Sequence, residues 1–199
     1  MPGSSPDPVM SHEVYLHIRV LIGIVLGLSL TRLLNGVARL VQHPGKVKVY
    51  PVHLIWVAII LITSIHFWWW ELALEGLPRW RFELFLFVLG YAFLFALLAN
   101  LLFPDQLDEY SGYQDYFLSR RGWFFGLFIA TMIADLIDSG LKGHGYIASL
   151  GPEYPVRIAI TILLSLIAIW TRNARFHLLF AAAYLVYYVS WIIRIYDPA

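Results

Sequence analysis

The 199-residue chain is 60% hydrophobic and 14% charged, and its net charge is +1. An average soluble domain is about 45–50% apolar and about 25% charged, so this composition excludes a soluble globular protein, and the small net charge gives no signal for binding nucleic acid. The chain contains no cysteine, which excludes disulfides, thiolate metal sites and cysteine nucleophiles.

Six apolar segments follow one another, most of them close to the length of about 20 residues that crosses about 30 Å of hydrocarbon. We expect them to be helices, because backbone exposed to lipid must satisfy its own hydrogen bonds. The polar residues 1–12 are expected to form a disordered tail, and residues 104–121 an interfacial connector with a short helix. The predicted segments are 13–40, 51–74, 82–103, 122–141, 155–170 and 176–196.

The two halves of the chain share short motifs at the starts of their apolar segments. With three segments each, the second half would cross the membrane in the opposite sense to the first, which is typical of transporters. The sequence therefore predicts an all-α integral membrane protein with six transmembrane helices, arranged as two inverted three-helix repeats at 13–103 and 122–199. The matching residues are Tyr50-Pro51-Val52 with Tyr154-Pro155-Val156, Arg81-Phe82 with Arg175-Phe176, and Gly23-x-x-x-Gly27 with Gly126-x-x-x-Ala130.

Charged and polar side chains gather near both ends of the predicted bundle. We call the end where the chain starts side A and the other end side B. An ionisable residue inside a membrane segment usually faces protein or water and often marks function. Residues spaced by three, four or seven share one helix face, which groups Asp135, Asp138 and Lys142. The candidate binding or permeation residues are Arg32, Asn35, His53 and Asn100 at side B, Asp135, Asp138, Arg157 and Arg194 at side A, and His66 as a polar interior group.

Two interpretations of these charges remain open: structural ion pairs at each end, or polar vestibules that flank a binding or permeation path. In either case we expect Arg194 to lie within salt-bridge reach of Asp135 or Asp138, and Arg32 to contact neither aspartate.

Histidine and tryptophan suggest further alternatives. His17 with His66, or His53 with His177, could in principle hold a haem between helices, although His53 and His66 point in directions about 140° apart on one helix. Tryptophans 68–70 read as an aromatic belt at the membrane surface, with a cation–π site beside Glu71 as the alternative. No spacing typical of a metal site, nucleotide loop or serine nucleophile is present, so we expect no metal, no cofactor and no recognisable catalytic constellation.

The leading functional hypothesis is a transporter or channel for an ion or small solute, working between the two repeats as a homo-oligomer. The alternative is a non-catalytic accessory or scaffold subunit of a larger membrane complex, followed by a haem- or pigment-binding redox protein. The expected partners are membrane lipids, with no nucleic acid. Lys and Arg are slightly more numerous at side B, which by the positive-inside rule places side B in the cytoplasm and both termini outside a bacterial inner membrane.

Overall fold

The computed structural model describes residues 8–43, 45, 48–76 and 80–196, and these residues are almost entirely helical. Six of the helices, with the 3-10 helix η1 continuing α2, are long and apolar enough to cross a membrane. The predicted all-α architecture with six spanning segments is therefore confirmed at this level. The elements are α1 (Pro8–Gln42), α2 (Pro51–Trp70), η1 (Glu71–Gly76), α3 (Phe82–Leu102), α4 (Tyr113–Leu141), α5 (His144–Ser149), α6 (Glu153–Trp170) and α7 (Ala174–Tyr196).

Local sequence explains where several helices begin and end. α2 begins at Pro51, whose missing N–H costs nothing at a first helical position. Gly143 ends α4 with φ +104°, a conformation that favours glycine. α7 is capped by Asn173, whose side-chain oxygen accepts hydrogen bonds from the backbone N–H groups of Arg175 and Phe176 at 2.9 and 3.4 Å.

The largest differences from the expected segments are two helix starts and one additional helix. α1 already begins at Pro8, so residues 8–12 of the expected tail are helical, and residues 1–7 lie outside the described part. α4 begins at Tyr113, so the helical part of the expected connector is the first turns of α4 itself. The six-residue helix α5 between the fourth and fifth spans was not predicted, because its sequence is short and weakly apolar.

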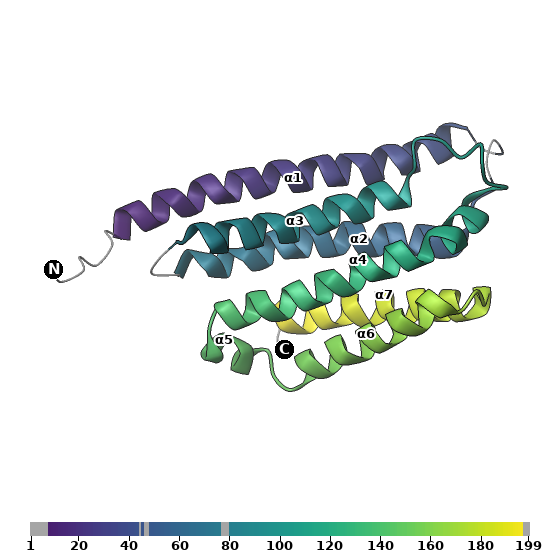
Figure 1. The fold of residues 1–199 in the computed structure, drawn as a ribbon. Helices are drawn as coiled ribbons and strands as arrows, with labels where there is room; N and C mark the ends of the chain where they lie inside the picture. The colour runs from purple at the N-terminus through teal and green to yellow at the C-terminus, as the bar shows by residue number, and fades with distance from the viewer. Residues whose placement is uncertain (1–7, 44, 46–47, 77–79, 197–199) are drawn as a thin grey trace.

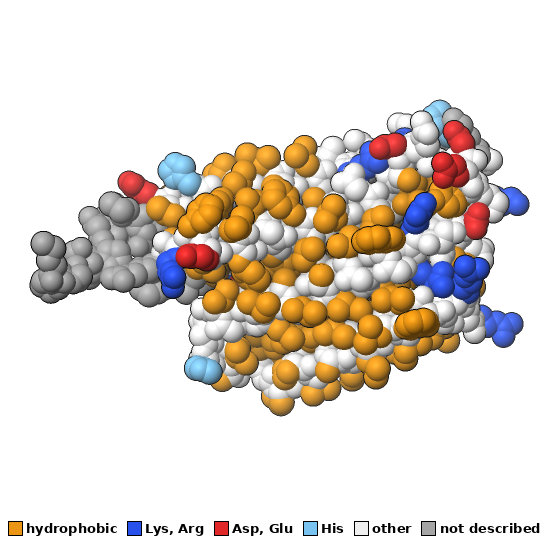
Figure 2. Space-filling model, viewed as in Figure 1, with side chains coloured by type: hydrophobic (Ala, Val, Ile, Leu, Met, Phe, Trp, Pro, Cys, Tyr) orange, Lys and Arg blue, Asp and Glu red, His pale blue; other side chains and the backbone are white. Residues whose placement is uncertain are grey.

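The helices form a bundle in which α4 lies centrally (Figure 1). α1 packs along α3, α3 along α4, α4 along α6, and α2 along α7. The chain starts and finishes at the same end of the bundle, side A (Figure 1). On the face shown in Figure 2, apolar side chains cover the middle, and the charged side chains gather towards the two ends. This distribution fits a bundle whose middle lies in hydrocarbon.

Helix packing does not reproduce the predicted equivalence of the two halves. α1 and α3 are the most closely packed pair of the first half, whereas the corresponding helices α4 and α7 have no close backbone approach along the described residues. Large side chains keep α4 and α7 apart, as in the ring contacts of Phe125 with Phe180 and of Phe128 with Tyr184. The recurring motifs therefore mark similar helix starts without producing a similar arrangement.

The glycine motifs also differ from expectation. A Cβ added at Gly27 or Gly126 would meet no heavy atom within 4 Å, so neither glycine allows a close helix contact. The close approach lies at Gly36 instead, where an added Cβ would come within 2.2 Å of the Phe103 ring. Gly36 was missed because it belongs to no repeated motif.

The interior is filled mainly by aromatic side chains. Trp56 of α2 is fully buried, and its ring contacts Phe124, Phe125 and Phe128 of α4 at centroid distances of 5.0–5.3 Å. Edge-to-face rings at such distances add about 0.5–1.5 kcal/mol per pair beyond area burial. This aromatic core fills the bundle towards side B, since Trp56 lies only five residues after Pro51, where α2 begins at side B.

Candidate functional site

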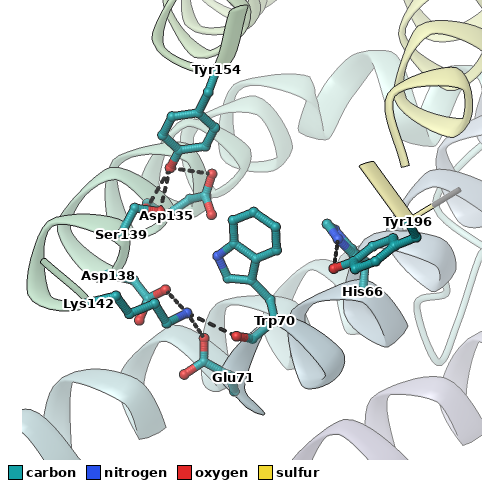
Figure 3. A network of polar contacts seen from close by, with 9 residues as sticks. All are labelled: His66, Trp70, Glu71, Asp135, Asp138, Ser139, Lys142, Tyr154 and Tyr196. Carbon is teal, nitrogen blue, oxygen red and sulfur yellow. Dashed lines mark hydrogen bonds and ion pairs between the residues drawn. The ribbon is translucent and has the colours of Figure 1, made fainter. Parts of the chain in front are cut away.

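Five ionisable side chains lie together near side A, four of them no more than 6% exposed and Asp135 15% exposed, and we call them the side A cluster. They come from three parts of the chain that meet at this end of the bundle: η1, the last turns of α4, and the first turns of α6. Figure 3 shows four of them with their aromatic neighbours. The members are Glu71, Asp135, Asp138, Lys142 and Arg157.

Lys142 joins two carboxylates. Its ammonium group donates to Asp138 one turn earlier in α4, to Glu71 Oε1 at 3.1 Å, and to the backbone carbonyl of Trp70 at 3.2 Å (Figure 3). The side chains of Lys142, Glu71 and Asp138 are only 1%, 4% and 0% exposed. A buried ion pair of this kind repays its desolvation only when further hydrogen bonds satisfy it, and the Trp70 carbonyl supplies one.

Asp135 and Arg157 form the second part of the cluster. Their closest oxygen and nitrogen atoms are 3.9 Å apart, longer than a hydrogen bond. The Tyr154 hydroxyl lies 3.0 Å from Asp135 Oδ2 and 2.8 Å from Ser139 Oγ (Figure 3). Asp135 is thus held by the tyrosine while its ion pair with Arg157 is loose.

Aromatic rings surround the guanidinium of Arg157. Its central carbon lies 3.9 Å from the Trp191 ring centre, with Tyr154 and Tyr188 at 5.4 and 5.5 Å. Such cation–π contacts contribute about 2 kcal/mol each when desolvated. They stabilise a positive charge without using its N–H donors.

A small cavity adjoins the cluster. It measures about 30 Å³, enough for one or two water molecules. His66 also lines it, and its two ring nitrogens lie 2.8 Å from the Tyr188 hydroxyl and 3.1 Å from the Tyr196 hydroxyl. Phe95 and Phe128 line the cavity as well, and Phe128 also belongs to the aromatic core.

The cluster has more acid than base. It holds three carboxyl groups and two basic groups, so one negative charge is in excess when all five are ionised. Glu71 Oε2 and Asp138 Oδ1 are buried and have no hydrogen-bond partner among the described residues. Burying an uncompensated charge is costly, so the arrangement favours one additional proton or small cation.

The neighbouring helix α5 covers the cluster from side A. Its Tyr146 ring lies 5.5 Å from Lys142 Nζ and 5.5 Å from the Trp70 ring. Burial raises the pKa of the Tyr146 hydroxyl well above its ordinary value, so this group stays neutral. Glycines with positive φ, Gly143 and Gly151, flank α5.

At side B the predicted residues have separate local partners. Arg32 reaches from α1 to the carbonyl of Phe103 at 2.6 Å and to Asp105, and as expected it contacts neither Asp135 nor Asp138. His53 is fully buried, donates from Nε2 to the Leu102 carbonyl at 2.6 Å, and stacks on Tyr113. These contacts tie the end of α3 to α1, α2 and α4.

The structure does not gather Asn35 and Asn100 with Arg32 and His53. Asn35 is exposed. Asn100 is also exposed and donates to the Ala96 carbonyl of its own helix. Hydrogen bonding within one turn satisfies a lone polar side chain on a helix surface, so of the four predicted side B residues only Arg32 and His53 meet, at the end of α3.

The predicted pairing of Arg194 with Asp135 or Asp138 is wrong. Arg194 forms a bidentate contact with Glu153 at 2.7 and 2.9 Å, on a half-exposed face of α6 and α7. Glu153 lies at the first residue of α6, where it can meet the end of α7 directly, while Asp135 and Asp138 lie deeper. Arg157, one turn into α6, is the cation that reaches Asp135.

Trp70 and Glu71 also depart from the expected aromatic belt. Trp70 is 7% exposed, packs against Trp191 and lines the cavity, whereas Trp69 is 53% exposed and fits the belt. The cation–π alternative beside Glu71 is closer to the structure, since Lys142 Nζ lies 5.6 Å from the Trp70 ring. The role of Glu71 was missed, because only the fold places η1 against the end of α4.

The paired histidines considered for a haem are engaged in the fold. His53 Nε2 donates to Leu102, and His177 Nε2 donates to the Thr171 carbonyl at 3.0 Å. Phe125 stacks on His177 at 5.6 Å. Both rings thus close helix ends at side B.

Comparison with protein-family models, curated proteins and solved structures found no match for this chain. The functional argument therefore rests on the geometry of the side A cluster.

Proposed function

We propose that this protein is a transporter for a small monovalent cation, either a proton or an alkali-metal ion, and that the side A cluster is its binding site. One observation carries the proposal: three carboxyl groups and two basic groups are buried together inside the end of a membrane-spanning bundle. Ionisable groups at such positions are costly and typically serve ion pathways.

The geometry supports binding of the transported cation beside Lys142. The ammonium of Lys142 lies between Glu71 and Asp138, which is where a cation would be bound by the two carboxylates. Each carboxylate keeps one oxygen without a partner among the described residues. A cation bound by these two free oxygens, beside Lys142, would balance the excess negative charge of the cluster.

In this conformation the path would be closed at both ends. Tyr146 and Trp70 cover the cluster at side A, and the rings around Trp56 fill the bundle towards side B. Transport would require α5 to open at one side and the aromatic core to rearrange at the other. We further propose that side B faces the cytoplasm, following the Lys and Arg bias, and that the protein works as a homo-oligomer. The proposal does not require the two halves to pack alike. It keeps the inverted repeat only as a similarity between the short motifs at the helix starts.

The test is ion flux in proteoliposomes, with proton, Na⁺ and K⁺ gradients applied in turn. We expect flux from the wild type and its loss in Asp138→Asn. Glu83→Gln is the matched control, because Glu83 is 74% exposed and pairs with Arg81 at the surface. If the folded wild type is as silent as empty liposomes with all three ions, the transport proposal is wrong.

The accessory-subunit alternative is distinguished by a different observation. The apolar faces of α1 and α7, with Leu28 and Val186 about 70% exposed, could cover a partner protein as well as lipid. Stoichiometric purification with another membrane protein, together with no flux, would favour this function.

A further inference from the structure

Glu71 and Asp138 bring two carboxyl groups to one ammonium group. Lys142 Nζ lies 3.1 Å from Glu71 Oε1 and makes a shorter contact with Asp138 Oδ2 (Figure 3). The two carboxyl groups also lie within hydrogen-bond reach of each other. Two carboxylates repel each other, whereas a protonated carboxyl group can donate a hydrogen bond to a carboxylate. The contact is therefore attractive when the pair holds one proton.

The same three side chains carry the excess negative charge of the side A cluster. Asp135 and Arg157 balance each other, although their ion pair is long at 3.9 Å. Among the described residues, Lys142 is the one cation in contact with Glu71 and Asp138. The side chains of these two acids are 4% and 0% exposed, so salt and water screen them little. Two carboxylates that share such a site cannot both stay ionised against one ammonium group unless a further ion binds.

The groups that face the pair from other elements are neutral or acidic. A tyrosine hydroxyl is uncharged at neutral pH, and a third carboxyl group can only add negative charge. Arg157 of α6 faces Asp135 and the Trp191 ring instead. The titratable side chains that interact electrostatically with the pair are Tyr15 of α1, Tyr91 of α3, Asp135 of α4 and Tyr146 of α5.

The surroundings of the pair favour a proton over a metal ion. No group of three or more acidic or histidine side chains that could hold a metal ion occurs in the described part of the chain. The cavity of about 30 Å³ is lined by Asp135 and His66, but not by Glu71 or Asp138. Hard metal cations take several oxygen ligands, and here such an ion would lie beside the ammonium of Lys142, which repels it. A proton between two carboxyl groups needs neither further ligands nor space.

We propose that the ion bound by the side A cluster is a proton, shared between the carboxyl groups of Glu71 and Asp138 beside Lys142. Its role as the transported ion rests on the proposed function, whereas the shared proton itself does not. When the proton leaves, two carboxylates remain in contact, and their repulsion favours separation of η1 from the end of α4. Binding of the proton and closure of this end of the bundle are thus coupled.

The experiment is infrared spectroscopy of the protein in lipid nanodiscs at pH 7, which detects the carbonyl stretch of a protonated carboxylic acid. We expect this band in the wild type. Glu71→Gln and Asp138→Asn should each lose it, because each leaves one carboxylate against one ammonium group. Asp135→Asn is the matched control, since it removes a carboxyl group of the same cluster from outside the pair, and it should keep the band.

Added salt tests the choice of ion without any substitution, so this part of the experiment does not depend on the folding of a variant. Saturating Na⁺ or K⁺ should leave the wild-type band unchanged. The proposal is overturned if the wild type has no such band, if either ion removes it, or if folded Glu71→Gln retains it. Flux measurements separate the two proposals. A band without flux of any ion contradicts transport alone, whereas Na⁺ or K⁺ flux without a band contradicts the shared proton alone.

Discussion

Lys142 Nζ lies 3.1 Å from Glu71 Oε1, and this contact joins the end of α4 to η1 across the bundle. Both groups lie at helix C-terminal ends, where the helix dipole favours the cation and disfavours the acid. The helix dipole therefore stabilises the positive charge of Lys142, whereas the negative charge of Glu71 is stabilised by Lys142. The contact also brings Asp138 and the Trp70 carbonyl to one ammonium group.

The first prediction concerns this dependence. Lys142→Met should destabilise the protein by about 3–5 kcal/mol, the usual cost of leaving a buried charge without its partner. The measurement is unfolding in detergent, followed by tryptophan fluorescence. Arg81→Met is the control, because its pair with Glu83 is about three-quarters exposed and should contribute about 0–1 kcal/mol. Equal costs for the two variants would show that burial of the cluster is not what makes Lys142 important.

The sequence predicted the six long helices and named four of the five residues of the side A cluster, all except Glu71. The length of an apolar segment predicts a spanning helix, and the spacing of Asp135, Asp138 and Lys142 predicts that they share one helix face. Their partners could not be predicted in the same way. Glu71 follows α2 in a 3-10 turn, and only tertiary packing brings it to α4.

The repeat illustrates a second limit of the sequence. Tyr-Pro-Val occurs twice because two helices begin in the same manner, with proline at or near the first turn. The distance between helices depends on the side chains at each contact. Gly36 lets Phe103 approach α1, whereas Phe125 and Phe128 hold α7 away from α4. Similar helix starts therefore led to different packing in the two halves.

The second prediction tests the contact at Gly36. Gly36→Ala places a methyl group within 2.2 Å of ring atoms of Phe103, whose ring is fully buried. Overpacking of this kind costs about 1–3 kcal/mol. Gly27→Ala, on the same helix with open space around it, should be neutral or stabilising by up to about 1 kcal/mol. Unfolding measurements compare the two variants, and Phe103→Leu should partly restore Gly36→Ala.

The third prediction is a pH dependence at Tyr50, which lies just before α2. Burial raises the pKa of the Tyr50 hydroxyl above 10.0, and the hydroxyl has no partner among the described residues. The unfolded chain loses this proton at lower pH than the folded one. The pH-dependent contribution of Tyr50 to the free energy of unfolding is therefore present below pH 10 and is lost as pH rises through the folded pKa. Between pH 9 and pH 11, about the range around the ordinary tyrosine pKa, the free energy of unfolding should therefore fall less in Tyr50→Phe than in the wild type.

The same variant has an effect at neutral pH. Removing a buried hydroxyl that lacks a partner also removes its desolvation cost, about 1–3 kcal/mol on mutational scales. Tyr50→Phe should thus be neutral or stabilising at pH 7. Tyr110→Phe is the control, since Tyr110 accepts hydrogen bonds from Arg120 near the surface. A clear loss of stability at pH 7 in Tyr50→Phe would contradict this prediction, because it would show that the Tyr50 hydroxyl has a hydrogen-bond partner.

The last prediction tests the excess of acid in the side A cluster. Glu71→Gln leaves two carboxyl groups and two basic groups, so the buried charges balance without a further proton or cation. The amide oxygen can still accept from Lys142, so the variant should change the free energy of unfolding by no more than about 1.5 kcal/mol, the scale of one hydrogen bond. Lys142→Met removes the same number of charges and should cost about 3–5 kcal/mol. Unfolding of the two variants in the same detergent makes the comparison. If Glu71→Gln is as destabilising as Lys142→Met, the third carboxylate is needed for folding, and the charge excess does not indicate a bound cation. If it folds normally and yet transports no ion, Glu71 serves the transported cation rather than the fold.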